Sequence, residues 1–312
     1  MIQIVQEKIA MKPENVNLNN SSIEELIQRA RILVEALPYI NAFRGAVVVI
    51  KYGGHAMIDE DLKHSVIQDV VLMELVGMKP VIVHGGGPEI TALMNKLGIE
   101  PRFVEGQRVT CEQTLEVAEM VLAGKLSGEI VNSINQAGGR AVGLSGKDGA
   151  LIQARRIGSG KGQPKEDIGF VGEVASIRPE IITILADNLY IPVISPIGVD
   201  DKGQTFNINA DTVAAEVAGA LRASKLIFLT DVRGIYMDPK DESTQIPSIN
   251  AEKIAELIRK GVISKGMIPK VNGGIEALRK GVGKTHILDG RIPHSLLLEL
   301  FTDRGIGTLI LP

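Results

Sequence analysis

The sequence predicts an α/β protein built as a three-layer αβα sandwich around a mainly parallel central sheet. From about residue 46 to residue 221, short apolar runs alternate with longer amphipathic segments, a pattern typical of parallel strands joined by helices. The runs at 47–50 and 81–83 contain only β-branched residues, as expected of strands that are buried on both faces. Helices must therefore cover both faces of the sheet.

An extra helix is expected ahead of this sheet, within an N-terminal extension at 1–44. Residues 1–20 are mostly polar toward their end, so we expect a frayed start. Ser22 and Glu25 form a predicted capping box, and apolar residues then recur at helical spacing until Pro38. The apolar stripe of this helix must cover either the sheet of its own subunit or another chain.

The elements of the sandwich follow in order through two lobes. In the first lobe, 45–222, strands are expected near 46–50, 81–84, 141–143, 150–154, 170–176 and 192–195. Its helices are expected near 60–76, 88–97, 112–123, 125–137, 178–187 and 210–221. In the second lobe, 223–312, we expect strands near 225–231, 284–288 and 307–311, with helices near 250–260, 271–280 and 293–302. The loop 155–168 is rich in Gly and Lys, and we interpret it as a solvated hairpin tip in preference to a binding loop.

Composition excludes several classes of function. The 312 residues have a net charge of −3 and only 3% aromatic residues, so no electrostatic case exists for nucleic acid or an anionic membrane as partner. No run of about eighteen uncharged apolar residues predicts a membrane span. Cys111 is the single cysteine, which rules out a disulfide framework and fits a reducing cytosol. We expect a cytoplasmic protein.

Two glycine-rich turns, Lys51–Gly54 and His84–Pro88, each follow a buried strand. Glycines at the carboxyl end of a strand let backbone N–H groups approach an oxyanion, and the helix after each turn adds its positive dipole end. Lys51 supplies a mobile cation, and Pro88 fits the first turn of a helix. The two turns together predict one site for a phosphate group.

Better-known phosphate motifs do not fit these turns. A P-loop requires its lysine after the glycines, whereas Lys51 comes before Gly53. A dinucleotide-binding fingerprint requires a G-x-G-x-x-G pattern, which neither turn contains. Read singly, each turn is also compatible with a plain strand-to-helix connection.

Six motifs in a fixed order carry a resemblance to a known family. They are the segments 50–54, 83–88, 106–110, 207–211, 229–234 and 266–271. Together they resemble the N-acetylglutamate kinases of the amino acid kinase family from about residue 45 to the end. The extension at 1–44 and the stretch 286–308 resemble the arginine-inhibited form of these enzymes. The resemblance implies the amino acid kinase fold, with acetylglutamate binding and dimerisation in the first lobe and ATP binding in the second.

The resemblance implies transfer of the γ-phosphoryl group of ATP, bound with Mg²⁺, to the side-chain carboxylate of N-acetyl-L-glutamate, an early step of arginine biosynthesis. A carboxyl with a reference pKa of about 4.3 is already ionised at neutral pH, so the reaction needs no general base. The sequence contains no pair of carboxylates that indicates a dedicated metal site. We therefore expect phosphates and water to hold the Mg²⁺ ion. The implied catalytic residues are Lys51, Lys270, Asp211 and Gly54.

Two further sets of residues are implied by the resemblance. The substrate-binding residues are Gly86, Gly87, Arg108 and Asn207. The nucleotide-binding residues are Gly53, Asp231, Gly234, Tyr236 and Met267. A guanidinium at position 108 can grip the α-carboxylate of the substrate through two hydrogen bonds, which a lysine cannot do.

Read without the resemblance, several of these residues have plainer interpretations. Arg108 is compatible with a surface ion pair, and Lys270 with an exposed lysine. Asn207 and Asp211 are compatible with a turn and a helix N-cap. His84 is expected to be structural, because the reaction requires neither an acid nor a base.

The implied site for the inhibitor L-arginine comprises Tyr39, His286, Glu299, Gly305 and Gly307. Glu299 is the candidate partner of the guanidinium, and its plainer interpretation is a solvent-facing acid on a leucine-rich helix. In such enzymes the N-terminal helices pair dimers into a homohexamer, a trimer of dimers. This pairing would bury the apolar stripe of the expected N-terminal helix. A PII-type signalling protein as a further partner has no support in the sequence.

Two alternatives compete with this interpretation. One is a non-catalytic sensor of arginine or nucleotide that keeps the fold, but both lysines, the glycines and Asp211 are present. The other is a kinase of the same family that acts on glutamate, aspartate, carbamate or a nucleoside monophosphate. The segments 106–108 and 207–209 argue against this second alternative.

Overall fold

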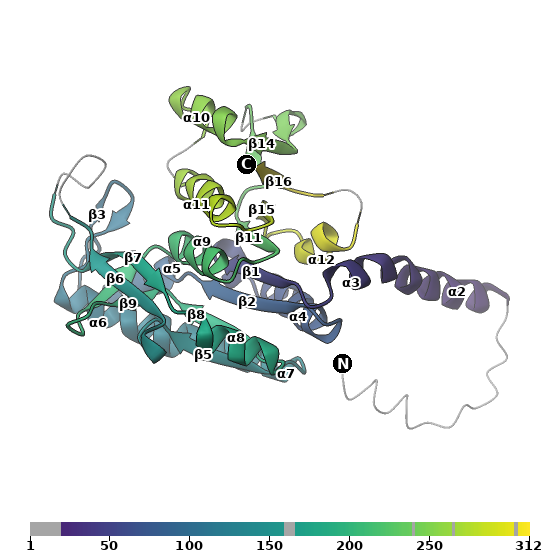
Figure 1. Ribbon diagram of the computed structural model, residues 1–312, viewed down its shortest axis with the longest axis horizontal. Coiled ribbons are helices and arrows are strands. Elements are labelled where there is room, and N and C mark those ends of the chain that lie inside the picture. The colour runs from purple at the N-terminus through teal and green to yellow at the C-terminus, as the bar shows by residue number, and fades with distance from the viewer. Residues whose placement is uncertain (1–19, 159–165, 239–240, 264–265, 303–304) are drawn as a thin grey trace. The chain divides into compact units, whose positions relative to one another are not determined.

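The computed structural model describes residues 20–158, 166–238, 241–263, 266–302 and 305–312 (Figure 1). It comprises two compact units, residues 1–42 and 43–312, which are described in turn. The frayed start expected at 1–19 lies outside the described residues.

The first unit contains the expected extra helix. Helix α2 spans Asn20–Glu35 and α3 spans Leu37–Phe43. The capping box predicted at Ser22 is wrong, because α2 already begins at Asn20 and serine is tolerated within a first turn as well as at a cap. The helix does end before Pro38, as expected. Pro38 lies in the first turn of α3, where its missing N–H costs nothing. The predicted stripe residues are all 40–62% exposed: Ile23, Leu26, Ile27, Val34 and Leu37.

The second unit is built on an eight-stranded sheet in the order β14-β16-β15-β11-β1-β2-β8-β5. The bounds are β1 Val47–Tyr52, β2 Lys79–His84, β5 Ala141–Ser145, β8 Ile191–Ser195, β11 Lys225–Thr230, β14 Ser248–Asn250, β15 Lys284–Asp289 and β16 Thr308–Leu311. Every neighbouring pair is parallel except β15 with β16. The predicted mainly parallel sheet is confirmed.

Helices cover both faces of this sheet and make two separate cores (Figure 1). One core contains side chains of α4 Glu60–Leu75, α5 Gly87–Lys96, α6 Glu112–Glu119, α7 Ser127–Gln136 and α12 Ser295–Leu300. The other contains side chains of α8 Glu180–Asp187, α9 Ala210–Ala220, α10 Ala251–Arg259 and α11 Ile268–Arg279. Val48 and Ile50 of β1 enter the first core and Val49 the second, as the alternation of a strand requires. The αβα sandwich follows directly from this alternation.

A small closed barrel, which the sequence pattern predicts only in part, stands apart from the main sheet. It consists of β6 Ile152–Arg156, β7 Val171–Ile177, β9 Ile197–Val199 and β10 Thr205–Ile208. Strands β6 and β7 form the expected hairpin, whose tip at 159–165 lies outside the described residues. Short pairs elsewhere are β3 Phe103–Val104 with β4 Gln107–Arg108 and β12 Ile235–Tyr236 with β13 Gln245–Ile246.

The helices expected at 112–123 and 125–137 are one continuous helical stretch. Between α6 and α7 the segment η2, Met120–Leu126, forms a π-helix. The predicted break at Gly124 is wrong, because wider hydrogen-bonded turns carry the backbone through this position. Single turns complete the fold: η1 Gly54–Met57, η3 Asp148–Ala150 and η4 Glu242–Thr244. In the part of the chain that the structure describes, no helix has the length and apolar character needed to cross a bilayer.

Candidate functional site

The two glycine turns lie side by side, because β1 and β2 are neighbours that end together. Tyr52 pairs with His84 in the sheet, and the backbone N–H of Gly85 donates to the Tyr52 carbonyl at 2.8 Å. The ammonium of Lys51 lies over this junction, since a Cβ added to Gly53 would be only 2.6 Å from Lys51 Nζ. One cation therefore serves both turns.

The π-helix packs against the second turn. A Cβ on Gly86 would lie 2.5 Å from Leu126 Cδ1 and 2.6 Å from Leu122 Cδ2, so only glycine fits there. Helix α5 begins at the next residue with Pro88 in its first turn and has no side chain capping its N-terminus. Its first N–H groups are thus left for a bound anion.

Asp211 joins the two lysines singled out in the sequence. Its Oδ1 lies 3.3 Å from Lys51 Nζ, and its Oδ2 accepts a hydrogen bond from Lys270 Nζ at 2.8 Å. Burial alone would raise the pKa of Asp211, but the two ammonium groups outweigh burial and hold this pKa below its usual range. Burial likewise lowers the pKa of Lys51, and Asp211 opposes that shift. The cluster carries one net positive charge.

Local structure explains why these three groups meet. Asp211 lies in the first turn of α9 and Lys270 in the first turn of α11, two helices that pack together. The N-cap of α9 is Asn209, which accepts from the backbone N–H groups of Asp211 and Thr212. The alternative that made Asp211 the N-cap and Asn207 a turn residue is therefore wrong, because Asn207 lies in a strand at Thr205–Ile208. An exposed Lys270 is also wrong, since its side chain is only 15% exposed.

A cavity of about 460 Å³ opens beside the second glycine turn. Its lining includes the expected substrate residues Gly86, Gly87, Arg108 and Asn207. Leu122 of the π-helix also lines it, a residue that the sequence analysis missed because π-helices have no recognised sequence signature.

Arg108 is buried in the wall of this cavity, with 8% of its surface exposed. Its Nη2 donates to the Gly87 carbonyl at 2.9 Å and to Thr91 Oγ1 at 2.7 Å. Within the described residues it forms no ion pair with a carboxylate, so the surface ion pair considered above is wrong. Asn207, on β10, also lines this cavity, and its amide Nδ2 lies 3.4 Å from Thr110 Oγ1. The wall thus presents a buried guanidinium whose charge is not neutralised.

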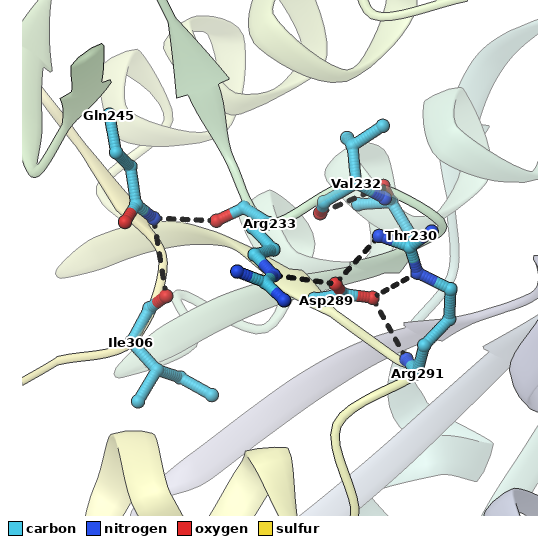
Figure 2. A network of polar contacts seen from close by, with 7 residues as sticks. All are labelled: Thr230, Val232, Arg233, Gln245, Asp289, Arg291 and Ile306. Atoms are coloured by element: carbon cyan, nitrogen blue, oxygen red, sulfur yellow. Dashed lines mark hydrogen bonds and ion pairs between the residues drawn. The ribbon is translucent and has the colours of Figure 1, made fainter. Parts of the chain in front are cut away.

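A second cavity, of about 660 Å³, lies at the carboxyl ends of β11 and β15. It brings together four of the expected nucleotide residues, Asp231, Gly234, Tyr236 and Met267, whereas Gly53 stays in the first glycine turn. Three charged residues that the sequence analysis missed also line it: Arg233, Asp289 and Arg291 (Figure 2). The sequence signal that could have found Arg233 was its place among polar residues directly after the buried strand β11.

Each of the two cavities is lined by a neighbour of Lys51. Gly85, over which Lys51 lies, lines the first cavity. The carboxylate of Asp231, which lines the second, occupies the space that a Cβ on Gly54 would need, and its charge acts on Lys51. Lys51 therefore has one neighbour in the lining of each cavity.

His84 is buried in the strand that leads to the second turn. Its Nδ1 lies 2.8 Å from the Gly85 carbonyl, and burial is the main reason that its pKa falls to about 4. At neutral pH the ring is uncharged and its Nδ1–H holds the turn, in line with the structural role expected from the sequence.

Replacing His84 with asparagine is expected to flatten the pH dependence of stability while keeping a donor for the Gly85 carbonyl. The depressed pKa of His84 stabilises the fold above about pH 6.5, and this contribution of about 3 kcal/mol is lost as the pH falls toward 4. Urea unfolding of both proteins at pH 7, 5.5 and 4.5 measures the difference. His64→Asn, at an exposed position, is the control, and parallel profiles for wild type and His84→Asn would contradict the expectation.

A cluster near the ends of β15, α12 and β16 contains four residues of the expected arginine site: His286, Glu299, Gly305 and Gly307. Glu299 Oε1 lies 2.7 Å from His286 Nδ1, and Oε2 accepts from the Ile306 N–H at 3.0 Å. Lys225 Nζ lies 3.4 Å from His286 Nε2 and 5.1 Å from the centre of the Phe43 ring. Glu299 is buried, so the solvent-facing alternative is wrong.

Electrostatics keep Glu299 ionised. Burial alone would raise the pKa of Glu299, but His286, the Ile306 N–H and Lys225 together hold it below the usual range. Gly305 lies against the same carboxylate, and Gly307 packs on the strand that carries His286. Tyr39, on α3, belongs to the first unit.

Comparisons with known proteins agree with this arrangement. The sequence model of the amino acid kinase family matches residues 46–289. Acetylglutamate kinase of Heliobacterium modesticaldum is 57% identical over 290 residues, which cover 91% of this chain and 98% of that protein.

Solved structures of an N-acetylglutamate synthase from Neisseria gonorrhoeae are also similar. The complex with coenzyme A and N-acetyl-glutamate matches with a TM-score of 0.79 at 28% identity, covering 91% of this chain and 63% of the synthase. The complex with coenzyme A and L-arginine has a TM-score of 0.76 at 27% identity, covering 90% of this chain and 65% of the synthase. This chain thus spans just under two thirds of that longer protein. By its family match and its identity to curated relatives, the chain belongs to the amino acid kinase family, within its acetylglutamate kinases.

Proposed function

We propose that this protein transfers the γ-phosphoryl group of ATP to the side-chain carboxylate of N-acetyl-L-glutamate, giving N-acetyl-L-glutamyl 5-phosphate and ADP, in arginine biosynthesis. The observation that carries the proposal is the pairing of Lys51 and Lys270 through Asp211. Gly85, in the lining of one cavity, and Asp231, in the lining of the other, both lie near Lys51. Two anionic reactants entering from the two cavities would meet at these cations.

The chemistry requires charge stabilisation and no proton transfer. The attacking carboxylate is ionised at neutral pH, and negative charge spreads over the phosphoryl oxygens as the group moves. Lys51, over the glycine turns, contacts the transferring group, and Lys270 stabilises the leaving phosphate. The N–H groups of Gly54, Gly86 and Gly87 add donors, and Asp211 positions both lysines.

Nucleotide binding is assigned to the second cavity, with Asp231, Gly234, Tyr236 and Met267 as its contacts. Lys51 lies over Gly53, at the end of the glycine turn beside this cavity, and supplies a cation for a polyphosphate. Magnesium supplies charge neutralisation on the phosphates when bound. The ion would be held mainly by the phosphates and water.

Arg108→Lys is expected to raise the KM for acetylglutamate by about tenfold or more and to leave the KM for ATP nearly unchanged. A lysine keeps the charge, but its three donors share one nitrogen, so it lacks the planar fork that can hold the Gly87 carbonyl through one nitrogen and meet a carboxylate through others. Steady-state kinetics with each substrate varied in turn measure both constants. Arg102→Lys, at an exposed position nearby, is the control, and equal changes in both constants would mean that Arg108 is structural.

The proposal is tested by assaying ADP release with a panel of acceptors. N-Acetyl-L-glutamate should support turnover, whereas L-glutamate, L-aspartate, carbamate and a nucleoside monophosphate should not. Preference for any of the other acceptors would replace the proposed function with that alternative.

We further propose feedback inhibition by L-arginine in a cytoplasmic homohexamer. Glu299 would bind the guanidinium, and the backbone near Gly305 and Gly307 would receive the carboxylate of the inhibitor. Two observations support this: the buried, ionised Glu299 and the similarity to a synthase structure that contains L-arginine. Tyr39 would complete the site, and the exposed stripe of α2 would join dimers.

A further inference from the structure

The second cavity holds an arginine that is fixed from behind by a buried acid. Asp289, 2% exposed at the end of β15, accepts three hydrogen bonds of 2.9 Å from Arg291, through its backbone N–H, Nε and Nη2 (Figure 2). Arg233 Nε lies 4.0 Å from the same carboxylate. Asp289 therefore fixes the plane of the Arg291 guanidinium and attracts a second cation.

The outer side of this guanidinium remains available. Arg291 is about half exposed and lines the cavity, and among the described residues its Nη1 has no acceptor. Its hydrogen bond to Asp289 is the main reason that its pKa is raised, with the charge of Asp231 adding to the shift. A permanently charged fork with unused N–H groups faces the cavity.

The position of Arg291 indicates which part of a nucleotide it meets. Thr230 pairs with Asp289 in the sheet, so the residues that follow them, Asp231 and Gly290, are neighbours. A Cβ on Gly290 would lie 3.0 Å from Ala56 Cβ, in the turn directly after the first glycine turn. Arg291 thus lies on the side of the cavity next to the phosphate-binding turn.

The remaining lining differs in chemistry. Val262, Ile263 and Met267 come from the connection between α10 and α11 and are apolar. An apolar wall suits a base, whereas charged groups at the ends of β11 and β15 suit phosphates. We therefore assign the base to this apolar wall, which comes from a different segment of the chain than Arg291.

We infer that Arg291 binds the non-transferred phosphate groups of the nucleotide and that Asp289 is the positioning residue that orients it. The inference rests on the proposed function, in which this cavity binds ATP. Arg291 would hold the α- and β-phosphates while Lys51 and Lys270 act on the γ-phosphoryl group. Neither Asp289 nor Arg291 takes part in bond making.

The test compares ligands that differ only in their phosphates. Arg291→Gln keeps a donor for Asp289 and removes the charge. It should weaken ADP binding by about ten- to a hundredfold, the scale of a charge-assisted hydrogen bond, and leave adenosine binding within about twofold. Dissociation constants come from calorimetry on the full chain, with thermal unfolding as a check of folding. Arg279→Gln, which removes an exposed ion pair on α11, is the matched control.

Asp289→Asn tests the positioning role. This substitution should weaken the binding of ADP and leave the binding of adenosine nearly unchanged, as Arg291→Gln does. Combining the two substitutions should cause little further loss of ADP binding, because Asp289 acts through Arg291. Equal losses for ADP and adenosine, or no loss for ADP, would overturn the inference.

The same measurements separate this inference from the proposed function. A wild-type protein that binds ADP but does not phosphorylate acetylglutamate would refute the function, and Arg291 would still be judged by its ADP binding. A wild-type protein that binds no ADP would overturn both.

Discussion

Lys51→Ala is expected to lower turnover by roughly 10²–10³-fold or more with the fold intact, and Lys270→Ala should act similarly. Each substitution removes a cation that is already in place where charge develops during phosphoryl transfer. The fold should tolerate either change, because Asp211 keeps the other lysine as its counter-ion and is not left as an unpaired buried charge.

The measurement is single-turnover kinetics at saturating substrates, with thermal unfolding to confirm folding. Lys79→Ala removes a lysine of neighbouring β2 that pairs with Asp187 at 2.7 Å, away from the glycine turns, and serves as the control. Lys51→Ala with turnover near that of this control would remove the basis of the proposed mechanism.

Deletion of residues 1–44 is expected to leave an active dimer that has lost most arginine inhibition. The apolar residues of α2 are exposed, and pairing them with a second subunit would bury them in a larger assembly. Without α2 and Tyr39, arginine would no longer favour one conformation of the ring, although Glu299 and His286 would remain. Sedimentation velocity and inhibition curves measure the two effects.

The deletion also removes Phe43, whose ring lies beside Lys225, so a second variant is needed. Ile27→Glu combined with Val34→Glu disrupts the apolar stripe and keeps Phe43, and Gln28→Glu on the same helix is the control. If both the deletion and the double variant stay hexameric, or arginine inhibits them as strongly as the wild type, the helix packs on its own subunit.

The elements that could be predicted are those with local signals. The β-branched runs of β1 and β2 and the glycines after them predict buried strands and close backbone approach, and both appear in the structure. The pairing of Lys51 with Lys270 and Asp211 could be anticipated only through the resemblance, because three distant segments supply these residues.

The parts that escaped prediction lack a local signal or depend on long-range pairing. Strands β9 and β10 are too short to show a period of two, and they are stabilised by closing a barrel with β6 and β7. A glycine at position 124 predicts a break between two helices. In the structure a π-helix spans this position, and its Leu122 and Leu126 pack against Gly86. The place of Asp289 and Arg291 in the second cavity could not be predicted, because it depends on the pairing of β15 with β11.

The most direct test of the account follows an oxygen atom from substrate to product. N-Acetyl-L-glutamate labelled with ¹⁸O in both side-chain carboxylate oxygens is incubated with the protein, ATP and Mg²⁺, and hydroxylamine traps the acyl phosphate. Attack of the carboxylate on the γ-phosphorus places a labelled oxygen in the bridge, and hydroxylamine then releases it with the phosphate. The account predicts hydroxamate together with phosphate that carries one ¹⁸O atom. Unlabelled phosphate, or no hydroxamate, would contradict it.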